Sequence, residues 1–123
     1  MSRDMIHLMH VLFAQEQNDC EDAPWCPPAD IYHSADGSWI VKYDLAGVRP
    51  EDLSLTAEGQ RLSLRGLRRD HLMKRGYRYY RMEIAYNQFE RNLELPCDVE
   101  HASIATEYSH GMLLVHITPE AQK

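Results

Sequence analysis

The chain has 123 residues, of which 44% are hydrophobic and 26% charged, values typical of a globular domain that exclude wholesale disorder. Its length suits one domain and is too short for two. The formal net charge of −6 gives a nucleic-acid partner no global electrostatic support, so we expect no such partner.

The charges are unevenly distributed along the chain. From Asp4 to Val41 there are seven acids and no Lys or Arg, whereas from Arg65 to Arg81 there are seven bases and one acid, Asp70. Two interpretations stay open. The segments are either two solvated surfaces of opposite sign, which charge runs usually are, or they contact each other within a subunit or across a dimer.

Cysteine usage and the N-terminal stretch bear on the compartment. Cys20, Cys26 and Cys97 form no Cys-x-x-Cys pair, and their odd number argues against a disulfide framework. We therefore expect reduced thiols and a cytoplasmic location. The apolar stretch from Met5 to Phe13 is too short to span a membrane and does not resemble a signal peptide, so no membrane partner is expected.

The first predicted element is a short amphipathic helix, followed by a proline-rich linker that completes an N-terminal arm of residues 1–28. The helix either covers its own domain or offers an adaptable surface to unfolded chains, for which methionine is well suited. Its apolar residues recur mostly at three- and four-residue spacing, and they are Met5, Ile6, Leu8, Met9, Leu12 and Phe13.

From Asp30 onward the apolar residues alternate, which predicts β-strands. Asp36-Gly37 stands between two extended runs and predicts a hairpin. Further alternating runs follow, and a basic, tyrosine-rich segment at residues 66–81 is long for a loop. Regularly spaced short strands indicate a β-sandwich or barrel. The alternating residues are Trp39, Val41, Tyr43 and Leu45; Leu53 and Leu55; Leu62 and Leu64; Phe89, Arg91, Leu93 and Leu95; Ile104, Thr106 and Tyr108; and Leu113, Val115 and Ile117.

Three motifs, in the right order, resemble the small heat-shock proteins, which are built on the α-crystallin domain. The first is Gly-Val-x-Pro-Glu-Asp-Leu at residues 47–53, and the second is Phe-x-Arg-x-x-x-Leu-Pro at residues 89–96. The third resembles Ile-x-Ala-x-x-x-Asn-Gly-Val-Leu through Ile104, Gly111 and Leu113. His110 stands where that signature has Asn, and Asn87 stands where bacterial members usually have Gly.

The resemblance implies an immunoglobulin-like β-sandwich at residues 29–118 and an ATP-independent holdase that binds partly unfolded client proteins. It also implies a homodimer formed by strand exchange through residues near 66–86. Residues 119–123 form a short C-terminal tail without the family's Ile-x-Ile motif, so we expect a dimer or small oligomer, with another small heat-shock protein as a further assembly partner.

A holdase needs an adaptable apolar surface, so we expect the six apolar residues of the N-terminal helix to bind clients. The resemblance implies two further sites. An edge groove is implied at Leu53, Leu55 and Ile104. Dimer contacts are implied at Ile31, Tyr77, Tyr79, Tyr80, Arg81 and Arg91.

Other functions remain as alternatives. One is a monomeric sandwich that serves a larger ATP-driven chaperone as a co-chaperone module. Another is an enzyme using Cys97 or a His/Asp pair, which would require a strongly perturbed pKa. No catalytic motif occurs, and the seven histidines lack the spacing of a closed zinc site, so we expect no catalytic residue, no metal and no cofactor.

Overall fold

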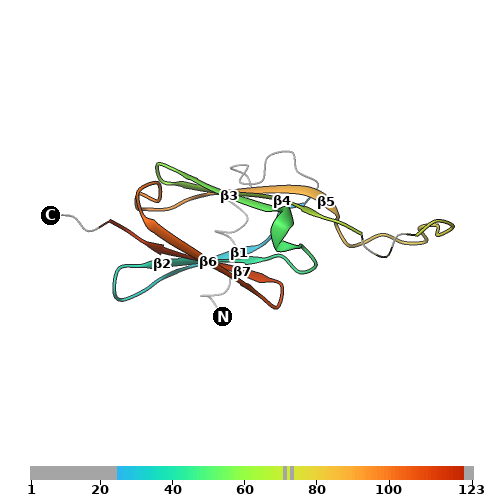
Figure 1. Ribbon diagram of the computed structural model, residues 1–123, viewed down its shortest axis with the longest axis horizontal. Coiled ribbons are helices and arrows are strands. Elements are labelled where there is room, and N and C mark those ends of the chain that lie inside the picture. Colours follow the sequence, from blue (N-terminus) through green and yellow to red (C-terminus); the bar gives the residue numbers. More distant parts are fainter. Residues whose placement is uncertain (1–24, 71, 73, 121–123) are drawn as a thin grey trace, which may run out of the picture.

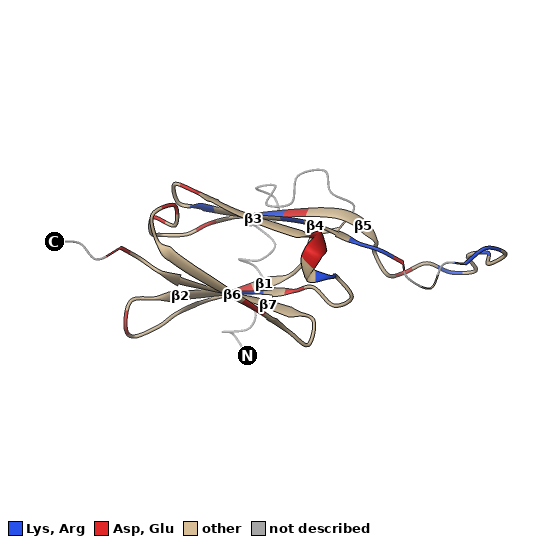
Figure 2. Cartoon of the chain, viewed as in Figure 1, with Lys and Arg blue, Asp and Glu red and all other residues tan. Residues whose placement is uncertain are grey.

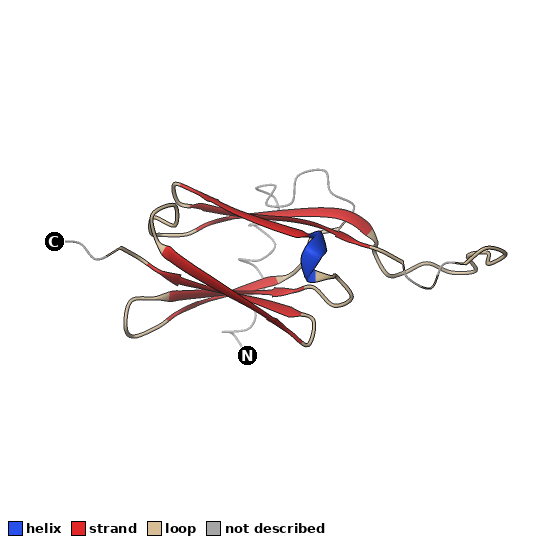
Figure 3. Ribbon diagram, viewed as in Figure 1, coloured by secondary structure: helices blue, strands red, loops and turns tan. Residues whose placement is uncertain are grey.

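The computed structural model describes residues 25–70, 72 and 74–120, which form two antiparallel sheets packed face to face (Figure 1, Figure 3). One sheet has the strand order β1-β2-β7-β6 and the other β3-β4-β5. The elements are β1 (Ala29–His33), β2 (Trp39–Asp44), the 3-10 helix η1 (Pro50–Asp52), β3 (Leu53–Glu58), β4 (Arg61–Arg68), β5 (Asn87–Glu94), β6 (Ser103–Ser109) and β7 (Met112–Thr118). The predicted all-β sandwich is confirmed, and the predicted N-terminal helix lies outside the described residues.

The core lies between the sheets and follows from the alternation of apolar residues. Along β2, Val41 and Tyr43 are buried whereas Lys42 between them is only half-buried. Successive side chains of a strand point to opposite faces, so one face of each sheet supplies the core. The buried hydrophobic residues are Val41, Tyr43, Leu45, Val48, Leu62, Leu64, Phe89, Leu93, Leu95, Val99, Leu113, Val115 and Ile117.

The last strand lies inside its sheet, and its apolar residues divide between the two faces of that sheet. β7 pairs with β2 on one side and with β6 on the other. Leu113, Val115 and Ile117 are buried in the core, whereas Met112 lies partly exposed on the outer face. On that face His116 Nε2 lies 3.2 Å from Glu107 Oε1 of β6, which gives the histidine a polar partner.

Two positions of positive φ explain departures from the family motifs. His110 has φ 54° and Gly111 has φ 78°, so the β6–β7 hairpin turns through two residues of positive φ, as tight hairpins prefer. Asn87 has φ 75°, the conformation that the glycine of related sequences would adopt without strain. Asn and His are among the residues enriched at positive φ, so both substitutions keep the local backbone conformation.

Gly66 of β4 allows a close approach of two neighbouring elements. A Cβ atom at this position would lie 2.4 Å from the Phe89 ring and 3.0 Å from the backbone oxygen of Asp52. Only glycine therefore lets the Phe89 ring lie across β4 while η1 packs against the same strand. This packing places the Asp52 side chain beside the end of β4.

Candidate functional site

The edges of the two sheets are the first candidate interaction surfaces. β1 and β6 end one sheet, and β3 and β5 end the other. On β1 the side chain of Ile31 is 42% exposed and pairs in register with Val41 of β2. Among the described residues β1 pairs with β2 alone, so its outer edge offers unpaired backbone groups to another strand.

A groove of about 230 Å³ runs between β3 and β6. Leu53 and Leu55, both predicted for an edge groove, line it. Ile104 is absent from the lining, but it lies on the same face of β6 as Thr106 and Tyr108, which do line the groove. The remaining lining residues are Pro50, Leu64, Glu107 and Leu113.

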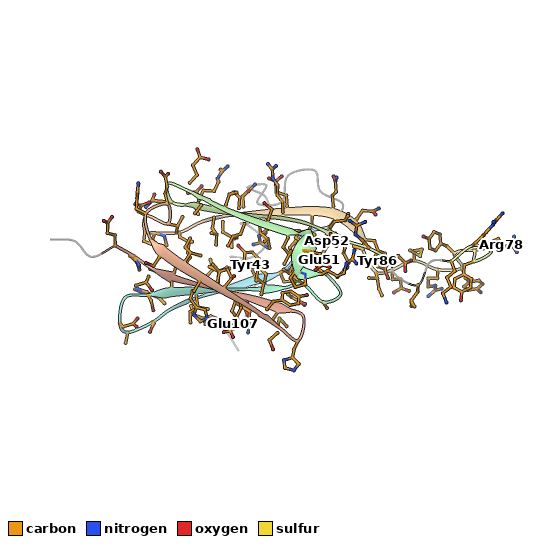
Figure 4. The ribbon with its side chains drawn as sticks, in the orientation of Figure 1. Tyr43, Glu51, Asp52, Arg78, Tyr86 and Glu107 are labelled. Atoms are coloured by element: carbon orange, nitrogen blue, oxygen red, sulfur yellow. The ribbon has the colours of Figure 1, made fainter. Side chains whose placement is uncertain are left out.

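The third candidate surface is a loop that projects far beyond the sandwich. Residues 74–86, which we name the projecting loop, extend from the ends of β4 and β5 (Figure 1). The part of residues 69–86 that the structure describes contains no strand, and residues 66–68 of the predicted exchange segment belong to β4. Figure 4 places Arg78 at the far end of the loop.

The projecting loop is both apolar and basic. Tyr77, Tyr79 and Arg81, predicted as dimer contacts, line one hollow of about 660 Å³, whereas Tyr80 is absent from that lining and is 99% exposed. Exposed cations concentrate toward the tip, as the blue segment of Figure 2 shows. The other large apolar residues exposed along this segment are Leu72, Met82 and Ile84.

Two arginines at the end of β4 hold the base of the projecting loop. Arg68 donates from Nε to the carbonyl of Ala85 at 2.8 Å and from Nη1 to that of Ala46 at 3.2 Å. Its guanidinium also stacks 4.0 Å from the centre of the Trp25 ring. Nothing in the sequence pattern predicted this role, because the partners are far from Arg68 along the chain.

The second arginine, Arg69, pairs with Asp52 of η1. Its Nε and Nη2 atoms lie 3.2 Å and 3.3 Å from the two carboxylate oxygens. The Asp52 side chain is only 11% exposed, and Arg49 Nε approaches the same carboxylate at 3.3 Å. The hydrogen bond from Arg69 and the neighbouring positive charges hold the pKa of Asp52 below its ordinary value.

Arg91 lies in the sandwich rather than on the projecting loop. From β5 its Nη1 donates to the carbonyl of Pro27 at 3.0 Å and lies 3.6 Å from the sulfur of Cys26. The structure therefore does not bring Arg91 together with the loop tyrosines, and its predicted dimer contact stays a prediction.

The cysteines differ from the sequence expectation. Cys26 is disulfide-bonded, so the prediction of reduced thiols is wrong for this residue. The odd number of cysteines concealed the bond, because counting alone does not show which thiols meet. Cys97 is a free cysteine, and burial together with the charge of Asp98 raises the pKa of its thiol. A nucleophilic cysteine needs the opposite shift.

Other predicted sites can be located only in part. The six client-binding residues, from Met5 to Phe13, lie outside the described residues. Within residues 25–70, 72 and 74–120, no group of three or more His, Cys, Asp or Glu side chains is arranged to hold a metal ion. That same part of the chain contains no helix of the length and apolarity needed to cross a membrane.

Comparisons with known proteins agree with one another. The sequence model of the Hsp20/alpha crystallin family matches residues 31–123. Over 115 residues the chain is 29% identical to spore protein SP21 of Stigmatella aurantiaca, covering 92% of this chain and 66% of that protein. Over 96 residues it is 22% identical to small heat shock protein C2 of Rickettsia felis, covering 78% of this chain and 62% of that protein. The chain thus spans less than two thirds of the length of either relative.

Solved structures show the same fold. The chain resembles hspA of Xanthomonas axonopodis with a TM-score of 0.65 and 27% identity, covering 79% of this chain and 96% of that one. A small heat-shock protein of Xylella fastidiosa, described as having a distinct high order structure, matches with a TM-score of 0.66 and 28% identity. That match covers 82% of this chain and 92% of the other.

Proposed function

The chain belongs to the Hsp20/alpha crystallin family, and we propose that it is an ATP-independent holdase that binds partly unfolded proteins and prevents their aggregation. The observation that carries this proposal is the family match over residues 31–123. The exposed apolar surface on the β3–β6 groove and the projecting loop supports it. Apolar surface of this kind marks interaction sites, and clients that expose apolar segments would bury it.

We assign client binding to the apolar residues of the N-terminal arm from Met5 to Phe13, with the β3–β6 groove as a second surface. Methionine side chains are flexible and polarizable, which suits contact with segments of no common sequence. Leu53 and Leu55 of the groove could receive an apolar segment in the same way, or a tail from another small heat-shock protein.

We further propose a homodimer in which the projecting loop of one subunit reaches β1 of its partner. The loop extends away from its own sandwich (Figure 1), and its residues Tyr77, Tyr79 and Tyr80 remain exposed in one chain. β1 carries Asp30 and leads out of an acidic segment, whereas the loop tip is basic, so the charges would steer the pairing. A monomeric co-chaperone would have no use for this uncovered loop.

The experiment that tests the holdase is light scattering of a heat-labile client protein, heated with and without this protein in the absence of nucleotide. We expect suppression near equimolar ratio. A variant with Met9→Ser, Leu12→Ser and Phe13→Ser should suppress less, whereas the matched variant Gln15→Ser and Gln17→Ser should behave as the natural chain. Full aggregation at a temperature where this protein stays folded would contradict the proposal.

We also propose a cytoplasmic location, for which the two described cysteines point in opposite directions. Cys97 is a free thiol, whereas a disulfide at Cys26 is typical of an oxidising compartment. Fractionation of the producing cells decides the matter. We expect the protein in the cytoplasmic fraction, and its recovery from an oxidising compartment would contradict this location.

A further inference from the structure

The base of the projecting loop is the best-connected part of that segment. Arg68 joins the two ends of the loop, because Nε and Nη2 both donate to the carbonyl of Ala85. The same guanidinium reaches Ala46 in the connection after β2, which belongs to the other sheet. One side chain thus ties the loop to both layers of the sandwich.

The Asp52–Arg69 pair adds a second attachment of defined direction. A guanidinium bound through two nitrogens to two carboxylate oxygens is fixed in its plane as well as in its distance. Figure 4 shows Asp52 at the end of the sandwich from which the loop leaves. The attachment can therefore set the direction of departure of the chain after β4.

The anchor for this pair is itself rigidly held. η1 packs against Gly66, where a Cβ atom would lie only 3.0 Å from the Asp52 backbone oxygen. The Tyr108 hydroxyl of β6 lies 2.9 Å from the carbonyl oxygen of Leu45 and 2.5 Å from that of Val48, both in the connection that leads to η1. Arg69 thus binds to a part of the sandwich that is fixed from two sides.

Farther along the loop, hydrogen bonds and ion pairs join loop residues to each other. Tyr77 donates its backbone N–H to Lys74, and Arg81 pairs with Glu83 at 3.4 Å. Such bonds shape the loop but do not aim it at a partner. A small rotation at the base would move the distant tip through a much larger arc.

We propose that Arg68 and the Asp52–Arg69 pair are positioning residues, which aim the projecting loop so that its tip meets the partner's β1 at a reduced entropic cost. This inference rests on the proposed dimer, because an orienting base matters only if the tip docks. Preorganising a segment in its bound direction strengthens association by removing the cost of ordering it. The side chains act through the loop and need not touch the partner.

The test measures dimer dissociation by sedimentation of the full chain over a dilution series. We expect Asp52→Asn, Arg69→Gln and Arg68→Gln each to raise the dimer Kd by roughly tenfold, and the Asp52→Asn, Arg69→Gln double variant to add little to either single change. The matched control is Arg65→Gln. Arg65 is on β4 like Arg68, and its ion pair of 2.8 Å with Glu90 of β5 lies away from the loop base. Its Kd should stay within about twofold of the natural value.

A second readout separates this inference from the dimer itself. A dye on Arg78→Cys, in a chain with Cys97→Ser, reports tip motion by anisotropy decay at a concentration well below the measured dimer Kd, where subunits are apart. We expect Asp52→Asn to increase the amplitude of fast motion and Arg65→Gln to leave it unchanged. Unchanged tip motion and unchanged Kd in all three base variants would overturn the inference alone. A natural chain that is monomeric at every concentration would overturn the proposed dimer and this inference with it.

Discussion

The Nη1 atom of Arg91 lies 3.0 Å from the carbonyl oxygen of Pro27, across 64 positions of sequence. Arg91 is on β5 of the three-stranded sheet. Pro27 lies two residues before the start of β1, which belongs to the four-stranded sheet. The hydrogen bond therefore attaches the segment that leads into β1 to the three-stranded sheet. This contact gives a structural reason for an arginine in the Phe-x-Arg motif, beside any role in a dimer.

Replacement of Arg91 should destabilise the fold. We expect Arg91→Lys to lower the free energy of unfolding by about 1–3 kcal/mol, because hydrogen bonds to charged groups contribute this much and a lysine lacks the fork geometry. Urea unfolding measures the loss. The control Arg61→Lys alters an exposed pair with Glu94 at 3.0 Å and should change stability by less than about 1 kcal/mol. Equal losses in the two variants would refute the role of Arg91.

A side chain at Gly66 should disturb the packing of β4. We expect Gly66→Ala to cost about 1–3 kcal/mol of unfolding free energy, because its Cβ would lie 2.4 Å from a buried Phe89 ring. Urea unfolding again gives the value. In a chain that carries Phe89→Leu, the change Gly66→Ala should cost less unfolding free energy than it does in the natural chain. The control Ser54→Ala, at an exposed position of β3, should be nearly neutral. A neutral Gly66→Ala would mean that the ring moves freely.

The hydroxyl of Tyr43 is a weak point of the core. It is buried without a hydrogen-bond partner among the described residues, and burial raises the pKa of Tyr43 against the opposing charge of Arg91. An unsatisfied buried donor costs about 1–3 kcal/mol. We therefore expect Tyr43→Phe to keep or raise the unfolding free energy, by up to about 1 kcal/mol. A clear loss of stability would show that a buried water satisfies the hydroxyl.

A pH-dependent pair lies in the connection between β5 and β6. His101 Nδ1 is 2.7 Å from Asp98 Oδ2, and this hydrogen bond, with the charges of Asp98 and Glu100, raises the pKa of His101 above 6.5. Because the pKa of His101 is raised on folding, protonated His101 stabilises the fold fully at pH values below 6.5. This stabilisation is lost as the pH rises through the pKa of His101 in the folded state. The same bond lowers the pKa of Asp98 below 3.8, so its contribution is present above 3.8 and lost on acidification.

The thermal midpoint should reflect this window. We expect the midpoint difference between the natural chain and His101→Gln to be largest at about pH 5 to 6 and to disappear by about pH 9. Asp98→Asn should abolish the same pH dependence, because the amide carries no charge, while its oxygen can still accept the hydrogen bond from the backbone N–H of Glu100. A midpoint difference that is constant from pH 5 to 9 would show that the charged pair contributes nothing.

The loop tyrosines give a direct test of the proposed dimer. We expect Tyr77→Ser with Tyr79→Ser to raise the dimer Kd by tenfold or more, because buried aromatic contacts contribute about 1–3 kcal/mol to binding. The unfolding free energy of the sandwich should change little. Sedimentation measures the mass. Met112→Ser changes a partly exposed apolar residue on the outer face of β7 and serves as the control. Dimers of unchanged stability in the tyrosine variant would exclude the loop from the interface.

Local pattern was enough to predict the sandwich and its turns. Alternation identified the buried faces of β2, β4 and β5, because the side-chain period of a strand is two. Asp36-Gly37 also predicted a hairpin, which the structure places between β1 and β2 with Gly37 at φ 91°. These features depend on neighbours within a few residues, and a sequence displays such neighbours directly.

Contacts between distant segments could not be predicted in the same way. Arg68 reaches Ala46 across 22 positions, and Asp52 meets Arg69 across 17, at separations that no periodicity encodes. The basic run suggested a charged surface but did not show which of its arginines are held at the loop base. The client surface and the dimer contacts stay predictions, because they depend on partners outside the single chain.

The most direct experiment asks whether the protein holds an unfolded client in solution. The full chain and a heat-labile client would be heated together without nucleotide, cooled, and separated by size-exclusion chromatography with mass determination by light scattering. We expect a soluble complex that contains both proteins and is larger than the dimer. Quantitative loss of the client to the pellet, with this protein eluting at its own mass, would contradict it.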